Sequence, residues 1–150
     1  MDKGLSHIEV ENVSKNDEFE LMFAHKGKIA KLIPQQSLKN YKHLLFLLKD
    51  LQSKGKLPLH PENNYLGENK LAKDIYISKY FLKNLEDDLV EKRPEDTFAR
   101  LAAFLAAVEV TKEKEEESAV KFYNDLFEGH FLPGGRVIAG AGDLYRLKTL

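Results

Sequence analysis

The chain has 150 residues, of which 43% are hydrophobic and 31% charged, with 23 basic residues against 24 acidic ones. This balance excludes a globally basic nucleic-acid binder, and the absence of cysteine excludes a disulfide scaffold, a thiol nucleophile and cysteine-ligated metal sites. No apolar run reaches the roughly eighteen residues that span a bilayer, and no apolar signal segment opens the chain. We therefore expect a soluble single globular domain over residues 1–150, cytoplasmic or delivered by a non-classical secretion route.

The first predicted element is a β-hairpin over residues 19–32. Phe19, Leu21 and Phe23 alternate with smaller or polar residues, a spacing typical of a half-buried strand. A two-residue turn at Lys26-Gly27 would place Leu21 opposite Leu32 and keep the large apolar residues on one face.

The middle of the chain predicts helices, because its apolar residues recur at spacings of three and four. Pro94 is a favourable first helical residue, and Gly129 is a favourable residue just beyond a helix end. The charged run from Thr111 to Glu117 is either a linker or a solvated part of a longer helix. The predicted helices cover residues 37–54, 68–92, 94–108 and 119–128.

The last residues predict a strand pair that joins the N-terminal hairpin. Apolar residues lie at 137–139 and at 144, 145 and 147, on either side of a Gly-Ala-Gly turn over residues 140–142. This turn resembles a dinucleotide-binding loop only superficially, since too few residues follow it to build a βαβ unit. We therefore expect an α+β fold that is helix-dominated, with about four helices and a small antiparallel β element formed by both ends of the chain.

Charge is distributed unevenly along the chain. From Leu21 to Lys56 there are eight lysines and one acidic residue, whereas from Asn84 to Glu128 there are thirteen acidic and six basic residues. This asymmetry predicts a surface with two oppositely charged regions, which favours oriented, salt-sensitive association with a partner or a second copy.

The first candidate binding site is a lysine-rich face with an aromatic residue at its centre. On a helical wheel of residues 37–54, Phe46 falls among lysines and away from the leucine stripe. The face can bind a protein partner, an anionic lipid surface or a nucleic acid, although the acidic second half disfavours a long polyanion. Alternatively, Phe46 packs beneath the hairpin or the proline-rich loop, and the lysines around it are merely solvated. The candidate residues are Lys26, Lys28, Lys39, Lys42, Phe46 and Lys49.

The second candidate site follows Gly129. Phe131 and Leu132 precede a Pro-Gly-Gly turn, and Arg136 comes shortly after it. An exposed apolar pair beside an arginine can insert into a bilayer or dock in a partner groove. Alternatively, Phe131 packs back on the last turn of the preceding helix.

Catalytic patterns are weak. The five histidines show no metal-ligand spacing, and no nucleophile, phosphate-loop or kinase motif is present. His60 and Glu62 lie two residues apart in a proline-rich loop but lack any third group, and the acidic clusters at 87–88 and 115–117 are typical of solvated helix faces. We therefore predict no catalytic residue, no metal site and no cofactor.

These observations favour a non-enzymatic interaction module that binds a protein partner through a charged, dipolar surface, as an adaptor does. The first alternative is a peripheral binder of anionic lipid headgroups or other phosphate ligands through the lysine-rich residues 21–56. The second is a small enzyme whose site is assembled from residues distant in sequence.

Overall fold

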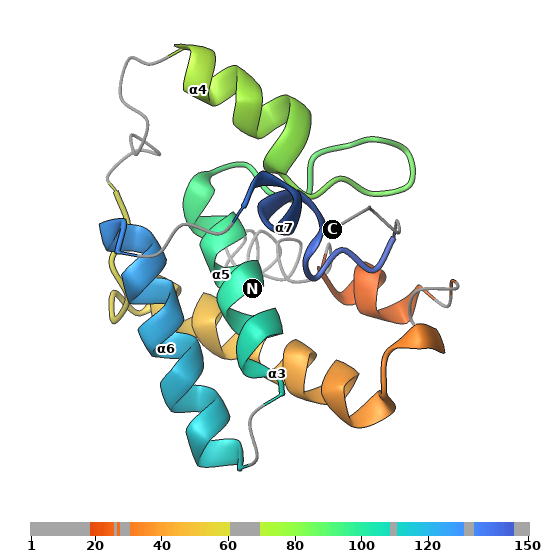
Figure 1. Cartoon of the computed structure of the whole chain (residues 1–150), viewed down its shortest axis with the longest axis vertical. Helices are drawn as coiled ribbons and strands as arrows, with labels where there is room; N and C mark the ends of the chain where they lie inside the picture. The colour runs from red at the N-terminus through yellow and green to blue at the C-terminus, as the bar shows by residue number, and fades with distance from the viewer. Residues whose placement is uncertain are drawn as a thin grey trace, which may run out of the picture.

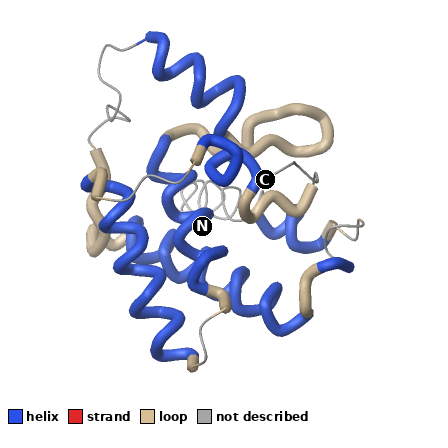
Figure 2. Tube along the Cα trace, viewed as in Figure 1, coloured by secondary structure: helices blue, strands red, loops and turns tan. Residues whose placement is uncertain are grey.

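The structure is a computed structural model that describes residues 19–25, 27, 31–60, 70–108, 111–130 and 134–145. Within these ranges the regular structure is helical, and Figures 1 and 2 show helices and loops without a strand. The predicted α+β class is therefore wrong. Besides a helical stretch at residues 19–24, the helices are α3 (Gln35–Ser53), α4 (Lys70–Ile75), the π-helix η2 (Tyr76–Tyr80), α5 (Pro94–Ala106), α6 (Lys112–Glu128) and α7 (Gly135–Gly140).

The predicted N-terminal hairpin is wrong because the same residues satisfy a helical period. Phe19 and Met22, three residues apart, are buried, whereas Leu21 is 66% exposed. A strand would have placed Phe19 and Leu21 on the same face. The lysines predicted to flank the hairpin turn, Lys26 and Lys28, lie outside the described residues.

The predicted C-terminal strand pair is wrong as well. Val137 and Ile138 lie in α7, which ends in a turn at residues 141–142. Gly142 has a φ of 83°, so this turn needs the glycine that the sequence places there.

Helices α3, α5 and α6 enclose the core and correspond to three of the predicted helices (Figure 1). Alanines let the neighbouring helices approach α5 closely, and Pro94 and Gly129 occupy the predicted end positions. The acidic run belongs to α6, because the Thr111 side chain caps the helix by accepting a hydrogen bond from the backbone of Lys114. The largest buried apolar side chains include Tyr41, Leu44, Leu45, Leu48, Leu101, Tyr123 and Leu126.

The helix predicted over residues 68–92 is only half correct. α4 and η2 contain no buried residue, and α4 stands away from α3, α5 and α6, whereas the end of η2 meets α7 (Figure 1). After Tyr80 the chain leaves the helix, and Phe81 and Leu82 are buried. Among the helices of the described ranges, none combines the length and apolar character needed to cross a lipid bilayer.

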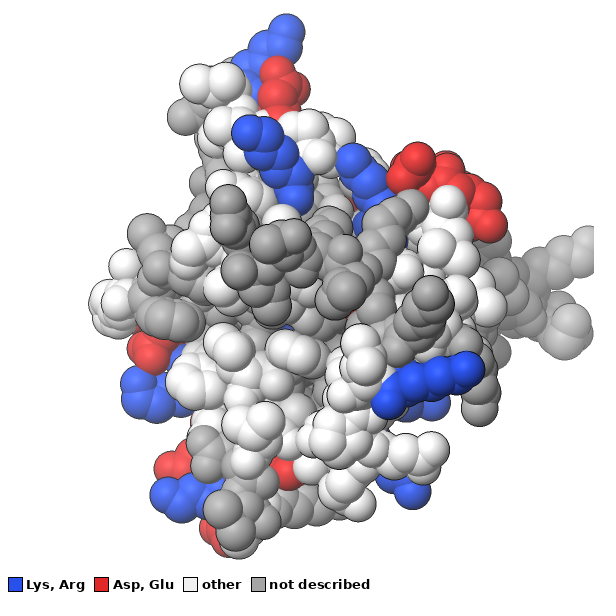
Figure 3. Space-filling model, turned by 45° about the vertical axis from the view of Figure 1, so that its right-hand side comes forward, with Lys and Arg blue, Asp and Glu red and all other residues white. Residues whose placement is uncertain are grey.

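Some residues of the basic part of the chain contact acidic residues of its second half within the fold. Lys49 of α3 pairs with Asp96 of α5, and His43 of α3 lies 2.9 Å from Glu116 of α6. On the face shown in Figure 3, basic and acidic side chains stand beside one another at several places. Opposite charges therefore help the basic and acidic parts of the chain to pack together.

Candidate functional site

A fully buried arginine lies at the centre of the fold. Arg100 of α5 has an exposed fraction of 0%, as does Glu91, which precedes the helix. Arg100 donates through Nε to one carboxylate oxygen of Glu91 at 2.7 Å and through Nη2 to the other at 3.3 Å. Burial alone would lower the pKa of Arg100, but the Glu91 carboxylate overcomes this effect and raises it. Arg100 and Glu91 therefore form a buried salt bridge.

The remaining donors of Arg100 bind backbone carbonyls. Nη2 donates to the carbonyl of Ile138 at 2.8 Å and to that of Tyr80 at 3.1 Å, and Nη1 donates to the carbonyl of Ala141. These carbonyls belong to η2 and to α7 with its following turn. One side chain thus joins η2, α5 and α7, and we call Arg100 with these partners and Glu91 the Arg100 network.

Glu91 also fixes the chain that follows η2. Its Oε1 accepts hydrogen bonds from the backbone N–H of Leu82 at 3.0 Å and from the Thr97 hydroxyl at 2.8 Å. A buried carboxylate needs such donors to offset its lost hydration. Glu91 can accept the hydrogen bond from Leu82 only if the chain turns back between these two residues. The helix that contains η2 therefore does not continue to residue 92.

A second side chain holds the same turn from the opposite side. The hydroxyl of Tyr41 in α3 donates to the carbonyl of Gly142 at 2.7 Å. Burial raises the pKa of Tyr41 far above its ordinary value, so the hydroxyl keeps its proton and remains a donor. A Cβ atom on Gly142 would lie 2.6 Å from this hydroxyl oxygen. Only glycine fits here, because of both its backbone conformation and the close approach of Tyr41.

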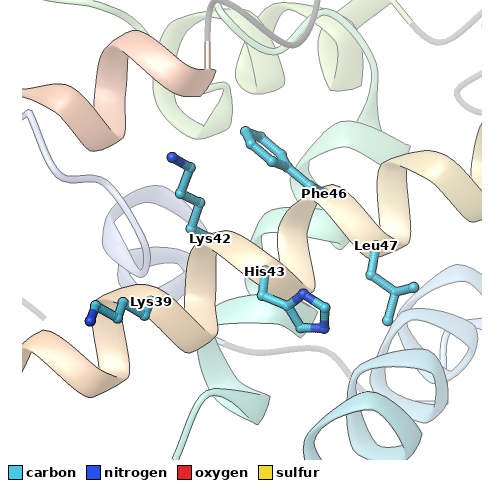
Figure 4. Close-up of a pocket in the computed structure, with 5 residues that line it drawn as sticks. All are labelled: Lys39, Lys42, His43, Phe46 and Leu47. Carbon is cyan, nitrogen blue, oxygen red and sulfur yellow. The ribbon is translucent and has the colours of Figure 1, made fainter. Parts of the chain in front are cut away.

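Part of the lysine-rich face predicted from the sequence forms a hollow on α3. Its lining residues are Lys39, Lys42, His43, Phe46 and Leu47, and its volume is about 360 Å³. Lys42 and Phe46 point to one side of α3, whereas His43 and Leu47 point to the other (Figure 4). We call this site the α3 hollow.

Neighbouring segments partly cover the α3 hollow. The ring of Phe46 meets that of Phe23 edge-on, with 6.2 Å between centroids. Lys42 pairs with Glu20 at 3.0 Å, and its Nζ lies 5.9 Å from the Phe46 centroid. Phe46 is therefore half-buried and contacts the N-terminal helical stretch, in the segment where the hairpin was predicted.

Of the other predicted binding residues, Lys49 is the one whose side chain the structure describes, and it does not line this hollow. Lys49 is turned toward the core, where it pairs with Asp96 and lies 5.1 Å from the Phe19 centroid. Phe131, Leu132 and the side chain of Arg136 lie outside the described residues, as do Lys26 and Lys28. The second candidate site therefore stays a prediction.

The acidic and histidine residues considered for catalysis have structural contacts. Glu115 is buried and accepts a hydrogen bond from Asn40 at 2.7 Å, so its interpretation as a solvated residue is wrong. The ring of His60 stacks on Phe127 with 4.4 Å between centroids. Glu62 lies outside the described residues, and among those described, no group of His, Asp and Glu could hold a metal ion.

A comparison with protein families matches residues 66–146 to the ribonucleotide reductase all-alpha domain. The match covers more than half of the 150 residues. The chain belongs to this family. No curated protein and no solved structure matches the chain.

Membership of the ribonucleotide reductase family corrects the predicted function. A non-enzymatic adaptor, or a binder of lipid or phosphate groups, is wrong because the match is to a domain of an enzyme. The all-alpha description also agrees with the helices observed. The Arg100 network lies wholly within the matched residues, whereas the α3 hollow precedes them.

The sequence analysis missed both Arg100 and Glu91. An arginine among the alanines and aromatic residues of α5 was the available signal, because an apolar helix face rarely carries an unpaired charge. Its partners could not be read from spacing. Glu91 lies before the helix, and the carbonyls of Ile138 and Ala141 come some forty residues later.

Proposed function

We propose that this chain serves as the helical domain of a ribonucleotide reductase, the enzyme that converts ribonucleotides into deoxyribonucleotides. Its role is to position a segment of the enzyme rather than to react with the nucleotide. The observation that carries this proposal is the Arg100 network, which lies within the family match and binds α7 and its turn to the core.

Two core helices hold the turn that follows α7. Arg100 reaches it from α5 and Tyr41 reaches it from α3. Asp143 adds a local bond, since its Oδ1 accepts from the backbone N–H of Tyr145 at 2.8 Å. A segment held from both sides cannot shift without disturbing the core, so it offers the rest of the reductase a surface of fixed geometry.

We also propose that the α3 hollow contacts protein, either another part of the reductase or a second copy of this chain. The hollow combines the apolar side chains of Phe46 and Leu47 with the basic side chains of Lys39 and Lys42, which suits an apolar side chain flanked by acidic groups. A photoreactive phenylalanine analogue at position 46 is expected to cross-link to such a partner. Cross-links confined to residues 19–24 of the same chain would contradict this role.

The positioning role is tested by turnover of the reductase that contains or binds this chain. Tyr41→Phe keeps the ring but removes the hydrogen bond to Gly142. The control is Tyr123→Phe, which acts away from α7: it removes a partly buried hydrogen bond of 2.8 Å to the carbonyl of Pro58 and the bond of 3.0 Å that the hydroxyl accepts from Gln52. Each variant is expected to lose roughly 1–2 kcal/mol of stability.

We expect only Tyr41→Phe to slow deoxyribonucleotide formation, by about tenfold, because small displacements near a reacting site are costly. Nucleotide chromatography measures the product directly. Equal turnover in the two variants, at temperatures where both remain folded, would show that the turn has no positioning role.

A further inference from the structure

A second hollow, of about 170 Å³, lies beside η2 and the start of α5. Its apolar lining consists of Ile77, Phe81, Leu89 and Pro94, and three basic residues, Lys73, Lys92 and Arg93, complete it. None of the residues that line it is acidic. We call it the η2 hollow.

The size and lining of the η2 hollow suit one apolar side chain. A cavity of about 150 Å³ lined by apolar residues holds a benzene-sized group. A nucleobase fits less well, because its polar edge needs hydrogen-bond partners that an apolar floor lacks. Lys73 and Lys92 are exposed, so they can pair with carboxylates that flank the inserted side chain.

The turn between η2 and α5 presents such a side chain. Leu85 is 51% exposed, and the three acidic residues that follow it, Glu86, Asp87 and Asp88, are exposed too. Asn84 fixes the turn, because its Oδ1 accepts from the backbone N–H groups of Glu86 and Asp88, each at 3.0 Å. The turn is therefore already shaped for docking, which lowers the entropy cost of binding.

We propose that Leu85 of one copy enters the η2 hollow of a second copy, and that the second copy does the same in return. The carboxylates of the turn then face the basic residues of the hollow. Leu89 lines the hollow, and it also closes the turn through an isolated antiparallel β-bridge with Lys83. The hollow and the turn are therefore adjacent on one molecule. That adjacency allows both contacts to form at once around a two-fold axis. This self-association does not depend on the proposed role in a reductase.

The test is a charge exchange between two variants, followed by sedimentation equilibrium. One variant carries Lys73→Glu and Lys92→Glu in the hollow, and the other carries Glu86→Lys and Asp88→Lys in the turn. All four residues are exposed, so both variants are expected to fold. Because the contact is small, association is measured at roughly 0.1–1 mM chain.

We expect the wild-type chain to dimerise, each variant alone to be monomeric, and an equal mixture of the two to dimerise again. In the mixture, each turn meets a hollow of opposite charge. Leu85→Ser is expected to abolish dimerisation, whereas Leu71→Ser, at a residue 71% exposed on α4 and outside the hollow, leaves it unchanged. A monomeric wild-type chain, or a mixture that stays monomeric, would overturn the proposal.

Discussion

Gly142 and Tyr41 meet where no side chain larger than hydrogen fits. A Cβ atom at Gly142 would lie 2.6 Å from the Tyr41 hydroxyl oxygen and 3.0 Å from Cγ of Arg100, at a φ of +83°. Gly55 has a similar φ of +73° but nothing within 4 Å of such an atom. Substitutions at Gly55 and Gly142 therefore separate the cost of backbone strain from the cost of steric crowding.

We expect Gly55→Ala to lower the free energy of unfolding by about 1–2 kcal/mol through backbone strain alone. Gly142→Ala is expected to cost roughly 1–3 kcal/mol more, because it also overfills the core beside Tyr41. Urea unfolding of the two variants measures the difference. Equal losses would mean that the contact with Tyr41 is not tight in solution.

Asp96 gives the molecule a pH-dependent contribution to stability. Burial alone would raise the pKa of Asp96, but Lys49, the backbone N–H of Lys92 and Arg93 together hold it below its ordinary value. A carboxylate with a lowered pKa in the folded state stabilises the fold above its unfolded pKa. This stabilisation is lost as the pH falls through the folded pKa.

The variant Asp96→Asn is therefore expected to be less stable than the wild type by about 1.5–3 kcal/mol at pH 7. The gap should narrow as the pH falls from about 5 to about 2. The control is Asp50→Asn, which breaks an exposed pair with Lys54 of 2.8 Å and should cost little at any pH. A gap for Asp96→Asn that does not change with pH would contradict this account.

At the scale of elements, the sequence predicted the three core helices well, and it predicted the end of the helix at residues 68–92 and the two terminal segments poorly. The helices α3, α5 and α6 repeat their apolar spacing over several turns, so the period is unambiguous. The apolar residues at 19–24 are so few that their spacing fits both the two-residue period of a strand and the 3.6-residue period of a helix. The burial of Met22 together with Phe19 agrees with the helix. The break after η2 depends on hydrogen bonds from Leu82 and Arg100 to Glu91, which no local pattern reveals.

The N-terminus of α6 provides a test at this scale. Thr111→Ala removes the side-chain acceptor that lies 3.1 Å from the backbone nitrogen of Lys114. We expect a loss of about 1 kcal/mol in unfolding free energy and faster amide exchange at Lys114. Thr111→Ser keeps the acceptor and should behave like the wild type, so identical results for Ala and Ser would exclude the cap as a source of stability.

At the scale of the whole molecule, the predicted dipolar surface takes a different form. Lys49 reaches Asp96 from α3, and Asn40 and His43 of the same helix reach Glu115 and Glu116 of α6. Contacts between the basic and the acidic part of the chain therefore support the core. Of the predicted binding residues whose side chains the structure describes, Lys39, Lys42 and Phe46 line one hollow and Lys49 does not.

Arg100 holds α7 and its turn to the core, and amide hydrogen exchange measures how firmly this segment is held. The N–H groups of Ile138, Ala141 and Asp143 donate within this segment, so they report its stability. Arg100→Lys keeps a positive charge beside Glu91 but cannot reproduce the planar set of donors. We predict at least about tenfold faster exchange of these three amides in the variant, while the amides of α6 are unchanged. Equal exchange rates of these amides in the wild type and in Arg100→Lys would show that Arg100 does not hold the segment.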